Sequence, residues 1–174
     1  MLRLIQISFL SLIALTLVSF IQPTRDVNLR YKAVFVYKFA QYVDWPKSFK
    51  TGDFIIGVFG DEKVYTEMQT SYANKMIGNQ TIKIKKFDAV GDIEQCHILF
   101  VAEKNSDKIA DLVKKYKSKS TLIVTEKEGK MKDGSVINFV WRDSKLKFEI
   151  SKTNAEKHKL TVGQSLTSIA DKVE

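Results

Sequence analysis

The side chains best suited to chemistry are few. The 174-residue chain holds one cysteine, Cys96, and two histidines, His97 and His158. Cys96 and His97 are neighbours at the start of an apolar run, and successive side chains of a strand point to opposite faces of a sheet. They therefore cannot form a thiolate–imidazole pair. Three soft ligands without paired spacing argue against a zinc site within one chain.

Motifs of the known catalytic classes do not occur in the sequence. We find no nucleophile elbow, no metalloprotease helix and no Walker-type loop. Asp and Glu are plentiful, but none sits in an apolar setting that would clearly raise its pKa. We therefore expect a protein without enzymatic activity, without a bound metal and without a cofactor.

A ligand-binding role is one interpretation of Gly57-Val-Phe-Gly60-Asp61, which joins an apolar strand to a helix. Glycine at such a junction lets an anion approach the free amide groups of the helix N-terminus. Open α/β sheets bind ligands at the carboxyl ends of parallel strands. Gly57, Gly60 and Asp61 are therefore candidate ligand-binding residues, in a crevice that would also include the strand ends at 102–103 and 125–126. A tight strand-to-helix turn is the plainer interpretation.

A run of aromatic residues between Tyr31 and Pro46 indicates a helix with a binding surface. Tyr31, Phe35, Phe39 and Tyr42 recur at steps of four, four and three, which predicts one stripe on an amphipathic helix facing the core. Pro46 ends the helix and leaves the preceding indole at the turn toward the first strand. The exposed remainder of this run is the predicted partner-binding surface, with candidate residues Tyr31, Tyr37, Tyr42, Trp45 and Pro46.

The elements that must position these residues alternate along the chain. Apolar periodicity predicts helices at about 26–43, 61–72 and 107–117, the last capped by Ser106. Buried or alternating runs predict strands at 54–59, 81–87, 98–101 and 120–125. Two further runs joined by a short polar connection predict a hairpin of 135–141 and 145–150. A short helix at 153–157 and a final helix at about 162–173 complete the prediction.

This order predicts a single three-layer α/β domain over residues 26–174. Alternating helices and strands imply right-handed crossovers and a mostly parallel sheet flanked by helices. The C-terminal hairpin adds antiparallel pairs at one edge. Strand 98–101 is apolar on both faces and should be central, whereas strand 81–87 should be half-buried or at an edge. A hydrophobic content of 44% with 28% charged residues is ordinary for such a domain.

The first residues predict export. Residues 4–21 carry no charge, follow Arg3 and precede a polar stretch, which is typical of a secretory signal peptide. We place the signal peptide at residues 1–19, with residue 22 as an alternative end. An uncleaved N-terminal anchor is the structural alternative, because 18 apolar-leaning residues can just span a bilayer. A lone cysteine in an exported chain means no internal disulfide, and a buried, unreactive thiol is expected for Cys96.

The formal net charge of +8 comes mostly from scattered lysines. Lys83, Lys85 and Lys86 fall in one predicted strand, and four more lysines close the helix at 107–117. Such lysines are typical of a solvated face, and no arginine–aromatic platform accompanies them, so nucleic acid is not an expected partner. An anionic membrane surface or an acidic protein face fits this charge better.

Several blocks of sequence, taken in order, resemble the YfiR/HmsC family of periplasmic proteins. Together they cover essentially all of residues 28–173. The blocks are 31–35 through Trp45-Pro46, 57–61, 96–100, 121–125, 133–137 and 147–151.

The resemblance implies a compact α/β domain in the periplasm, often dimeric. It further implies a domain that docks on the periplasmic sensor part of an inner-membrane diguanylate cyclase and holds that enzyme off, with effects on cyclic-di-GMP and biofilm. Histidine kinases are alternative sensor partners for the family.

Three positions depart from the family pattern. Better-known members carry two disulfides and respond to periplasmic redox state, whereas Cys96 stands here without a partner. Ser151 occupies a position where asparagine is common, and Gly163 one where serine is usual. Redox control by an internal bridge is therefore not expected in this chain.

Two functions from different classes follow. The leading hypothesis is a non-enzymatic periplasmic regulator that binds and represses the sensor part of an inner-membrane signalling protein, a diguanylate cyclase or a histidine kinase. The alternative is a periplasmic small-molecule-binding module that uses the strand-end crevice near Gly60. A homodimer is compatible with either.

Overall fold

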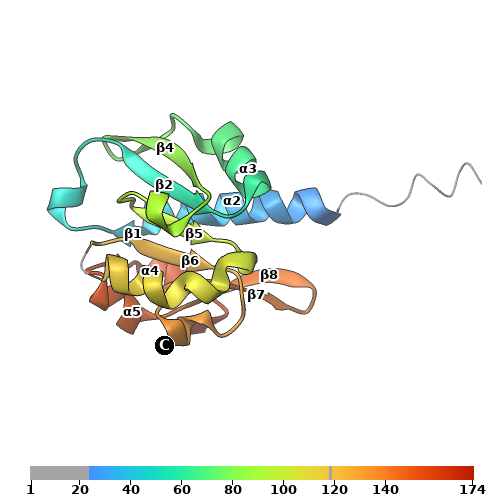
Figure 1. Cartoon of the computed structure of the whole chain (residues 1–174). Coiled ribbons are helices and arrows are strands. Elements are labelled where there is room, and N and C mark those ends of the chain that lie inside the picture. Colours follow the sequence, from blue (N-terminus) through green and yellow to red (C-terminus); the bar gives the residue numbers. More distant parts are fainter. Residues whose placement is uncertain (1–23, 118) are drawn as a thin grey trace, which may run out of the picture.

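The computed structural model describes residues 24–117 and 119–174 (Figure 1). The predicted signal peptide, and the anchor that is its alternative, lie outside the described residues.

An eight-stranded, curled sheet forms the centre of the molecule, in the order β10-β8-β7-β6-β5-β2-β4-β3. Its pairs are parallel except for β7–β8 and β3–β4. The predicted α/β class, the mostly parallel sheet and the C-terminal hairpin are confirmed. The strands are β2 (Phe54–Phe59), β3 (Met76–Ile77), β4 (Gln80–Phe87), β5 (Ile98–Val101), β6 (Leu122–Thr125), β7 (Ile137–Arg142), β8 (Lys145–Ile150) and β10 (Lys172–Val173).

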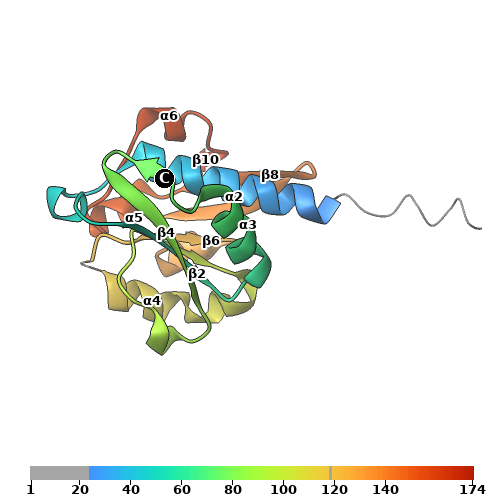
Figure 2. The same cartoon turned by 90° about the horizontal axis from the view of Figure 1, so that it is seen from above.

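Helices cover both faces of this sheet (Figures 1 and 2). Helices α2 (Thr24–Tyr42), α3 (Glu62–Tyr72) and α6 (Gln164–Thr167) pack on one face. Helix α4 (Ile109–Tyr116) packs on the other, and α5 (Lys152–Lys157) follows the hairpin. A small separate ribbon, β1 (Val43–Asp44) with β9 (Thr161–Val162), ties the end of α2 to the segment after α5.

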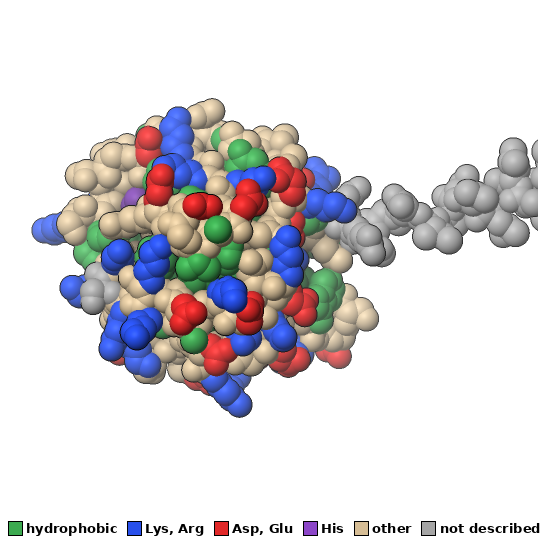
Figure 3. All heavy atoms as spheres, in the orientation of Figure 1, with side chains coloured by type: hydrophobic (Ala, Val, Ile, Leu, Met, Phe, Trp, Pro, Cys, Tyr) green, Lys and Arg blue, Asp and Glu red, His purple; other side chains and the backbone are tan. Residues whose placement is uncertain are grey.

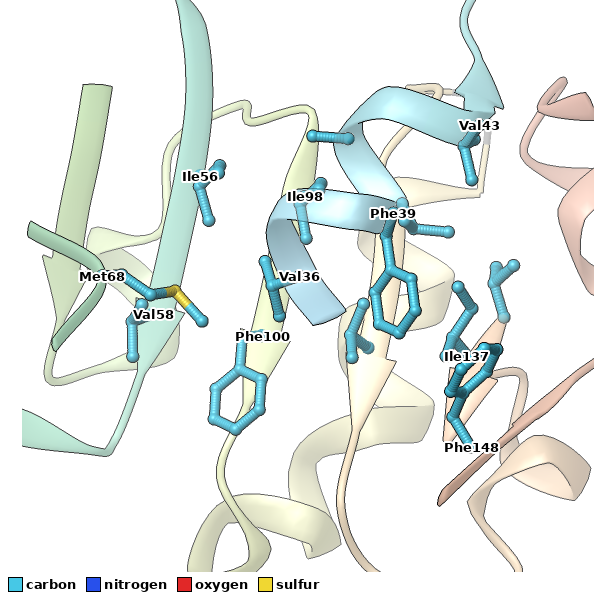
Figure 4. Packing of buried hydrophobic residues seen from close by; sticks show 14 of the residues in the cluster. Val36, Phe39, Val43, Ile56, Val58, Met68, Ile98, Phe100, Ile137 and Phe148 are labelled. Atoms are coloured by element: carbon cyan, nitrogen blue, oxygen red, sulfur yellow. The ribbon is translucent and has the colours of Figure 1, made fainter. Parts of the chain in front are cut away.

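The larger core lies where the sheet curls around α2. Figure 4 shows Val36 and Phe39 of α2, with Val43 of β1, between the side chains of β2 and β5 and those of β7 and β8. The Phe39 ring lies 5.1 Å from the Phe148 ring in an edge-on contact. The central strands carry apolar side chains on both faces. One face contributes to the core around α2, and the other contributes to a second core that α4 covers.

The second core holds the thiol that sequence analysis singled out. Cys96 is buried beneath α4, in the same cluster as Leu112 and Tyr116. Burial raises the pKa of its thiol to about 12, so the reactive thiolate is absent at neutral pH. The Tyr116 hydroxyl donates a hydrogen bond of 2.7 Å to the backbone carbonyl of Ile93. The expectation of a buried cysteine is confirmed, and its lack of reactivity stays a prediction.

Two predicted features near helix ends are wrong. Ser106 does not cap α4: a 3₁₀ segment, η4 (Glu103–Lys108), precedes that helix, and Ser106 is buried within it. The predicted final helix at 162–173 is instead β9, the four-residue α6 and β10. Backbone groups of this segment find partners elsewhere: Gly163 donates to the carbonyl of Tyr42, and Asp171 donates to that of Phe148.

Candidate functional site

The outer side of α2 carries a row of exposed side chains. Successive residues of an α-helix turn by about 100°, so Val27, Tyr31, Val34, Lys38 and Tyr42 project to one side. Tyr31 and Tyr42 are 54% and 40% exposed, and the two valines are also exposed. The Lys38 Nζ atom lies 5.6 Å from the centre of the Tyr42 ring, a cation–π contact. We call these five residues the outer α2 face.

The aromatic stripe predicted from the sequence is divided between core and surface. Each step of four residues advances about 40° around a helix, so Phe35 is half-buried and Phe39 is fully buried. The final step of three turns back and returns Tyr42 to the surface. The prediction of a shared core-facing stripe is therefore wrong for Tyr31 and Tyr42.

Tyr37 fills the contact between α2 and α3. Its ring stacks on Tyr72 with centroids 4.6 Å apart, and the Lys75 Nζ atom lies 4.7 Å from the Tyr72 centroid. Burial, and to a smaller extent the charge of Glu67, raise the pKa of the Tyr72 hydroxyl. Tyr37 is half-buried, so part of it remains accessible beside the outer α2 face.

Trp45 lies inside the fold, so the expectation that it belongs to the exposed remainder is wrong. The side chain is 5% exposed and packs edge-on against Phe54, with ring centroids 5.1 Å apart. The indole Nε1 has no hydrogen-bond partner among the described residues. Pro46 is half-buried, and its carbonyl accepts a 2.8 Å hydrogen bond from the Phe49 amide. A partner-binding role for Trp45, Pro46 and the three tyrosines stays a prediction.

His97 holds the loop that follows Trp45. The Ile55 amide donates to His97 Nδ1 at 3.1 Å, so the proton is on Nε2, which donates to the Phe49 carbonyl at 2.8 Å. The ring stacks on Phe54 with centroids 4.3 Å apart. Desolvation lowers the pKa of His97, and the bond to Phe49 only partly opposes it. The imidazole is therefore neutral and structural, and nothing in the sequence pattern pointed to this role.

A cavity of about 350 Å³ opens beside Trp45. Val43 and Phe54 contribute to its apolar wall, and the exposed ion pair of Lys50 with Asp44 (2.6 Å) lies at its rim. Ligand sites combine apolar walls with a few polar groups in this way. Trp45, whose indole N–H is unpaired among the described residues, is one of the wall residues.

The space beside the residues of the predicted strand-end crevice is filled by other parts of the protein. A Cβ on Gly57 would lie 2.7 Å from the Phe87 ring, and Gly60, with a φ of +87°, lies against the Asn105 side chain. Asp61 caps α3, since its Oδ1 accepts from the amides of Lys63 and Val64 at 2.9 and 3.0 Å. Ligand binding by Gly57, Gly60 and Asp61 stays a prediction.

The neighbouring strand ends are bridged by a carboxylate. One oxygen of Glu126 accepts the Glu103 amide at 2.9 Å, and the other pairs with Lys32 of α2. Both side chains of the ion pair are largely buried. This contact connects the first half of α2 to the carboxyl ends of β5 and β6.

Within residues 24–117 and 119–174, no cluster of His, Cys, Asp and Glu side chains has the geometry to hold a metal ion. The same residues include no helix that combines the length and the apolarity needed to cross a bilayer.

The match to a family model decides the relationship of the chain. The model described as YfiR/HmsC-like matches residues 29–171, which is most of the sequence. The chain belongs to the YfiR/HmsC-like family. No curated protein matches the chain.

Ser151 and Gly163, which sequence analysis named as departures from the expected family pattern, both form local hydrogen bonds. Ser151 caps α5 in this YfiR/HmsC-like protein, and its Oγ accepts the Asn154 amide at 3.2 Å. Gly163 donates its amide to the Tyr42 carbonyl at 2.9 Å. A Cβ at position 163 would lie 2.8 Å from that carbonyl oxygen, so glycine permits this close approach.

Proposed function

We propose that this protein is a non-enzymatic periplasmic regulator that docks through the outer α2 face on the sensor part of an inner-membrane signalling protein and represses it. Membership of a regulatory family supports the class of function. The observation that carries the docking surface is the exposure of two tyrosines and two valines along one side of α2.

This face has the composition of a protein-binding surface. Tyrosine supplies large contact area at low entropy cost, and aromatic anchors contribute most to interface energies. Lys38 at the middle of the face adds a positive charge beside Tyr42. With a net charge of +8, the chain should approach an acidic sensor face faster at low salt than at high salt.

The test is to delete the protein from cells, return the native chain or a variant, and measure whether repression is restored. Loss of the protein should raise cyclic-di-GMP, and the native chain should restore the low level. A Tyr31→Ser/Tyr42→Ser variant should not restore it, although it should fold and accumulate like the native chain because both side chains are exposed. Lys63→Gln, an exposed change on α3, is the matched control and should restore repression.

Two results would contradict the proposal. The first is an unchanged level of cyclic-di-GMP, together with unchanged output of a neighbouring sensor kinase, after loss of the chain. The second is full repression by the double tyrosine variant, which would remove the outer α2 face from the contact while leaving the regulatory role intact.

Small-molecule binding is a second candidate function, favoured by the unpaired Trp45 Nε1 beside the 350 Å³ cavity. A ligand that binds only the folded state raises its apparent stability. In a Trp141→Phe background, which leaves Trp45 as the sole tryptophan, a bound metabolite should raise the melting temperature and change the tryptophan emission together. A panel in which no compound changes both would exclude this candidate.

A further inference from the structure

A second cavity, of about 480 Å³, lies far along the chain from the aromatic run. It is formed by the end of α4, the 3₁₀ segment η5 (Lys130–Asp133) with Gly134, and α5. Four lysines from these three segments line it, and Figure 3 shows blue side chains gathered over the end of α4, at the lower left. We call it the lysine cavity, after Lys114, Lys117, Lys132 and Lys157.

The positive charge of the lysine cavity is not neutralised from within the described part of the protein. None of its four lysines takes part in an ion pair there. Asp133, the one acidic residue in the wall, pairs with Lys130 at 2.5 Å. Lys157 donates only to the neutral Asn154 Oδ1, at 3.2 Å. Like charges held around one hollow attract a counter-ion of high charge.

Buried contacts hold the wall in place. The Asn154 side-chain amide donates to the carbonyls of Met131 and Ser135, at 2.9 Å each, and so fixes α5 to the η5 segment. Gly134 brings that segment against α4, because a Cβ there would lie 2.7 Å from the Val113 side chain. The cavity is therefore a formed feature of the fold, assembled from three separate stretches of sequence.

His158 supplies an independent sign of a missing ligand. Its side chain lines the cavity and is only 1% exposed. The ring donates a hydrogen bond to the backbone of Tyr116, whereas Nδ1 has no hydrogen-bond partner among the described residues. Buried polar nitrogens are almost always paired with protein, water or a ligand, so an unpaired one beside a hollow calls for a partner.

We propose that the lysine cavity binds a phosphate-bearing ligand with two or more negative charges, either a free phosphate compound or the headgroup of an anionic phospholipid. Each lysine ammonium is a compact charge that suits phosphate oxygens, and phosphoryl groups concentrate charge as simple carboxylates do not. The volume admits a small phosphate compound. A hydroxyl or protonated phosphoryl oxygen of such a ligand can donate a hydrogen bond to Nδ1 of His158. The site is separate from the outer α2 face, and this proposal does not depend on the proposed role of that face.

The first experiment is calorimetric titration of the protein with inorganic pyrophosphate at about 150 mM NaCl, where surface charges are screened. Binding should weaken about tenfold in Lys114→Gln/Lys157→Gln, which loses two charged contacts. The control is Lys63→Gln/Lys145→Gln, which removes the same charge from exposed sites on α3 and β8. It should change binding by less than about threefold.

Histidine resonances give a second readout that does not depend on substitution. The chain has two histidines, so His97 serves as an internal control. Pyrophosphate should shift the ring signals of His158 and leave those of His97 in place.

The lipid source is separated by sedimentation with vesicles. Binding to phosphatidylglycerol vesicles but not to phosphatidylcholine vesicles, lost in Lys114→Gln/Lys157→Gln alone, assigns the site to a lipid headgroup. Pyrophosphate binding without vesicle binding assigns it to a free phosphate compound. Equal weakening in both double variants, or no binding to either probe, overturns the proposal.

Discussion

Buried polar side chains decide much of the local architecture. His97 connects β2 to the loop after Pro46, and Gln80 supports the same loop by donating to the carbonyls of Phe49 and Thr51. Below the hairpin, the Thr125 hydroxyl donates to Asn138 Oδ1 at 2.6 Å within a fully buried group. Such groups contribute to stability only while their hydrogen bonds stay intact, because an unpaired buried partner is costly.

Acidification should destabilise the protein through its histidines. Burial lowers the pKa of both His97 and His158 below the ordinary 6.5. Below that pH the unfolded chain binds protons that the folded chain excludes, so the free energy of unfolding is highest above pH 6.5 and falls toward the lowered folded-state values. At pH 5 the loss is at most about 2 kcal/mol for each histidine.

Urea unfolding between pH 5 and pH 7.5 in a phosphate-free buffer measures this loss. His97→Gln should be less stable than the native chain at pH 7.5, because the bond from the Ile55 amide is lost, and should show a shallower pH dependence. A native profile that is flat over this range would contradict the burial of both imidazoles as neutral groups.

Substitution of Trp45 should lower the stability of the protein, because the side chain is buried. Trp45→Ala removes a buried indole and is expected to cost about 3–5 kcal/mol in the free energy of unfolding. Trp45→Phe keeps most of the contact with Phe54 and loses only an N–H that has no partner among the described residues, so it should cost less than about 1.5 kcal/mol. Chemical denaturation of the two variants compares these values, and a loss in Trp45→Phe as large as that in Trp45→Ala would contradict this expectation.

At the scale of elements, close approaches between segments depend on glycine. Gly134 has a φ of +103° and lies against Val113 of α4, whereas Gly91 has no neighbouring atom within 4 Å of an added Cβ. Gly134→Ala should therefore lower the free energy of unfolding by about 1–3 kcal/mol, through backbone strain and contact with α4.

The matched control is Gly91→Ala, which has space for the methyl group and no positive φ. It should change stability by less than about 0.5 kcal/mol. The measurement is the urea midpoint of both variants, and a Gly134→Ala variant as stable as Gly91→Ala would mean that η5 and α4 can separate at little cost.

Most long helices and strands were predictable because a single pattern of apolar residues dominated each of them. Alternation identified the strand at 145–150, and uninterrupted apolar runs identified β2, β5 and β6, which are covered on both faces. The prediction of a helix at 162–173 was wrong because residues of this segment pair with the distant backbone of Tyr42 and of β8. A local sequence pattern holds no information on such pairing. The 3₁₀ segment before α4 was missed for a related reason, since Ser106 resembles a cap but is buried.

The candidate site was predictable only in part. Aromatic spacing identified α2, but steps of four residues drift around the helix, so spacing alone placed Tyr31 and Tyr42 on the wrong side. Burial of Trp45 depends on Phe54 and His97, which come from two other segments. The lysines of α4 were recognised as a basic helix end, but the cavity also needs Lys132 and Lys157, which only the tertiary fold brings near.

At the scale of the whole molecule, two apolar cores hold the domain without a covalent cross-link. The chain has one cysteine, and it is buried. The urea midpoint should therefore be the same with and without a reducing agent. Cys96 should react with a thiol reagent at pH 8 only as fast as the protein unfolds, because its pKa of about 12 leaves almost no thiolate in the folded state.

Labelling rates at increasing urea measure this accessibility. Rapid labelling of the native protein, at a rate independent of urea, would show that the second core opens locally, and a midpoint that falls on reduction would reveal a bond between two chains.

The packing of α2 against the hairpin has a consequence for biosynthesis. Phe39 contacts Phe139 and Phe148 across roughly three fifths of the chain, with ring centroids 5.7 and 5.1 Å apart. A ribosome releases the helix long before it has made the strands that cover it. The apolar face of the helix therefore stays exposed until the strands near the C-terminus have been synthesised. Folding that depends on contacts between distant parts of the sequence is slow. Late folding of this kind gives chaperones time to capture the chain, and the proposed export would benefit because an unfolded chain can still pass through a translocation pore.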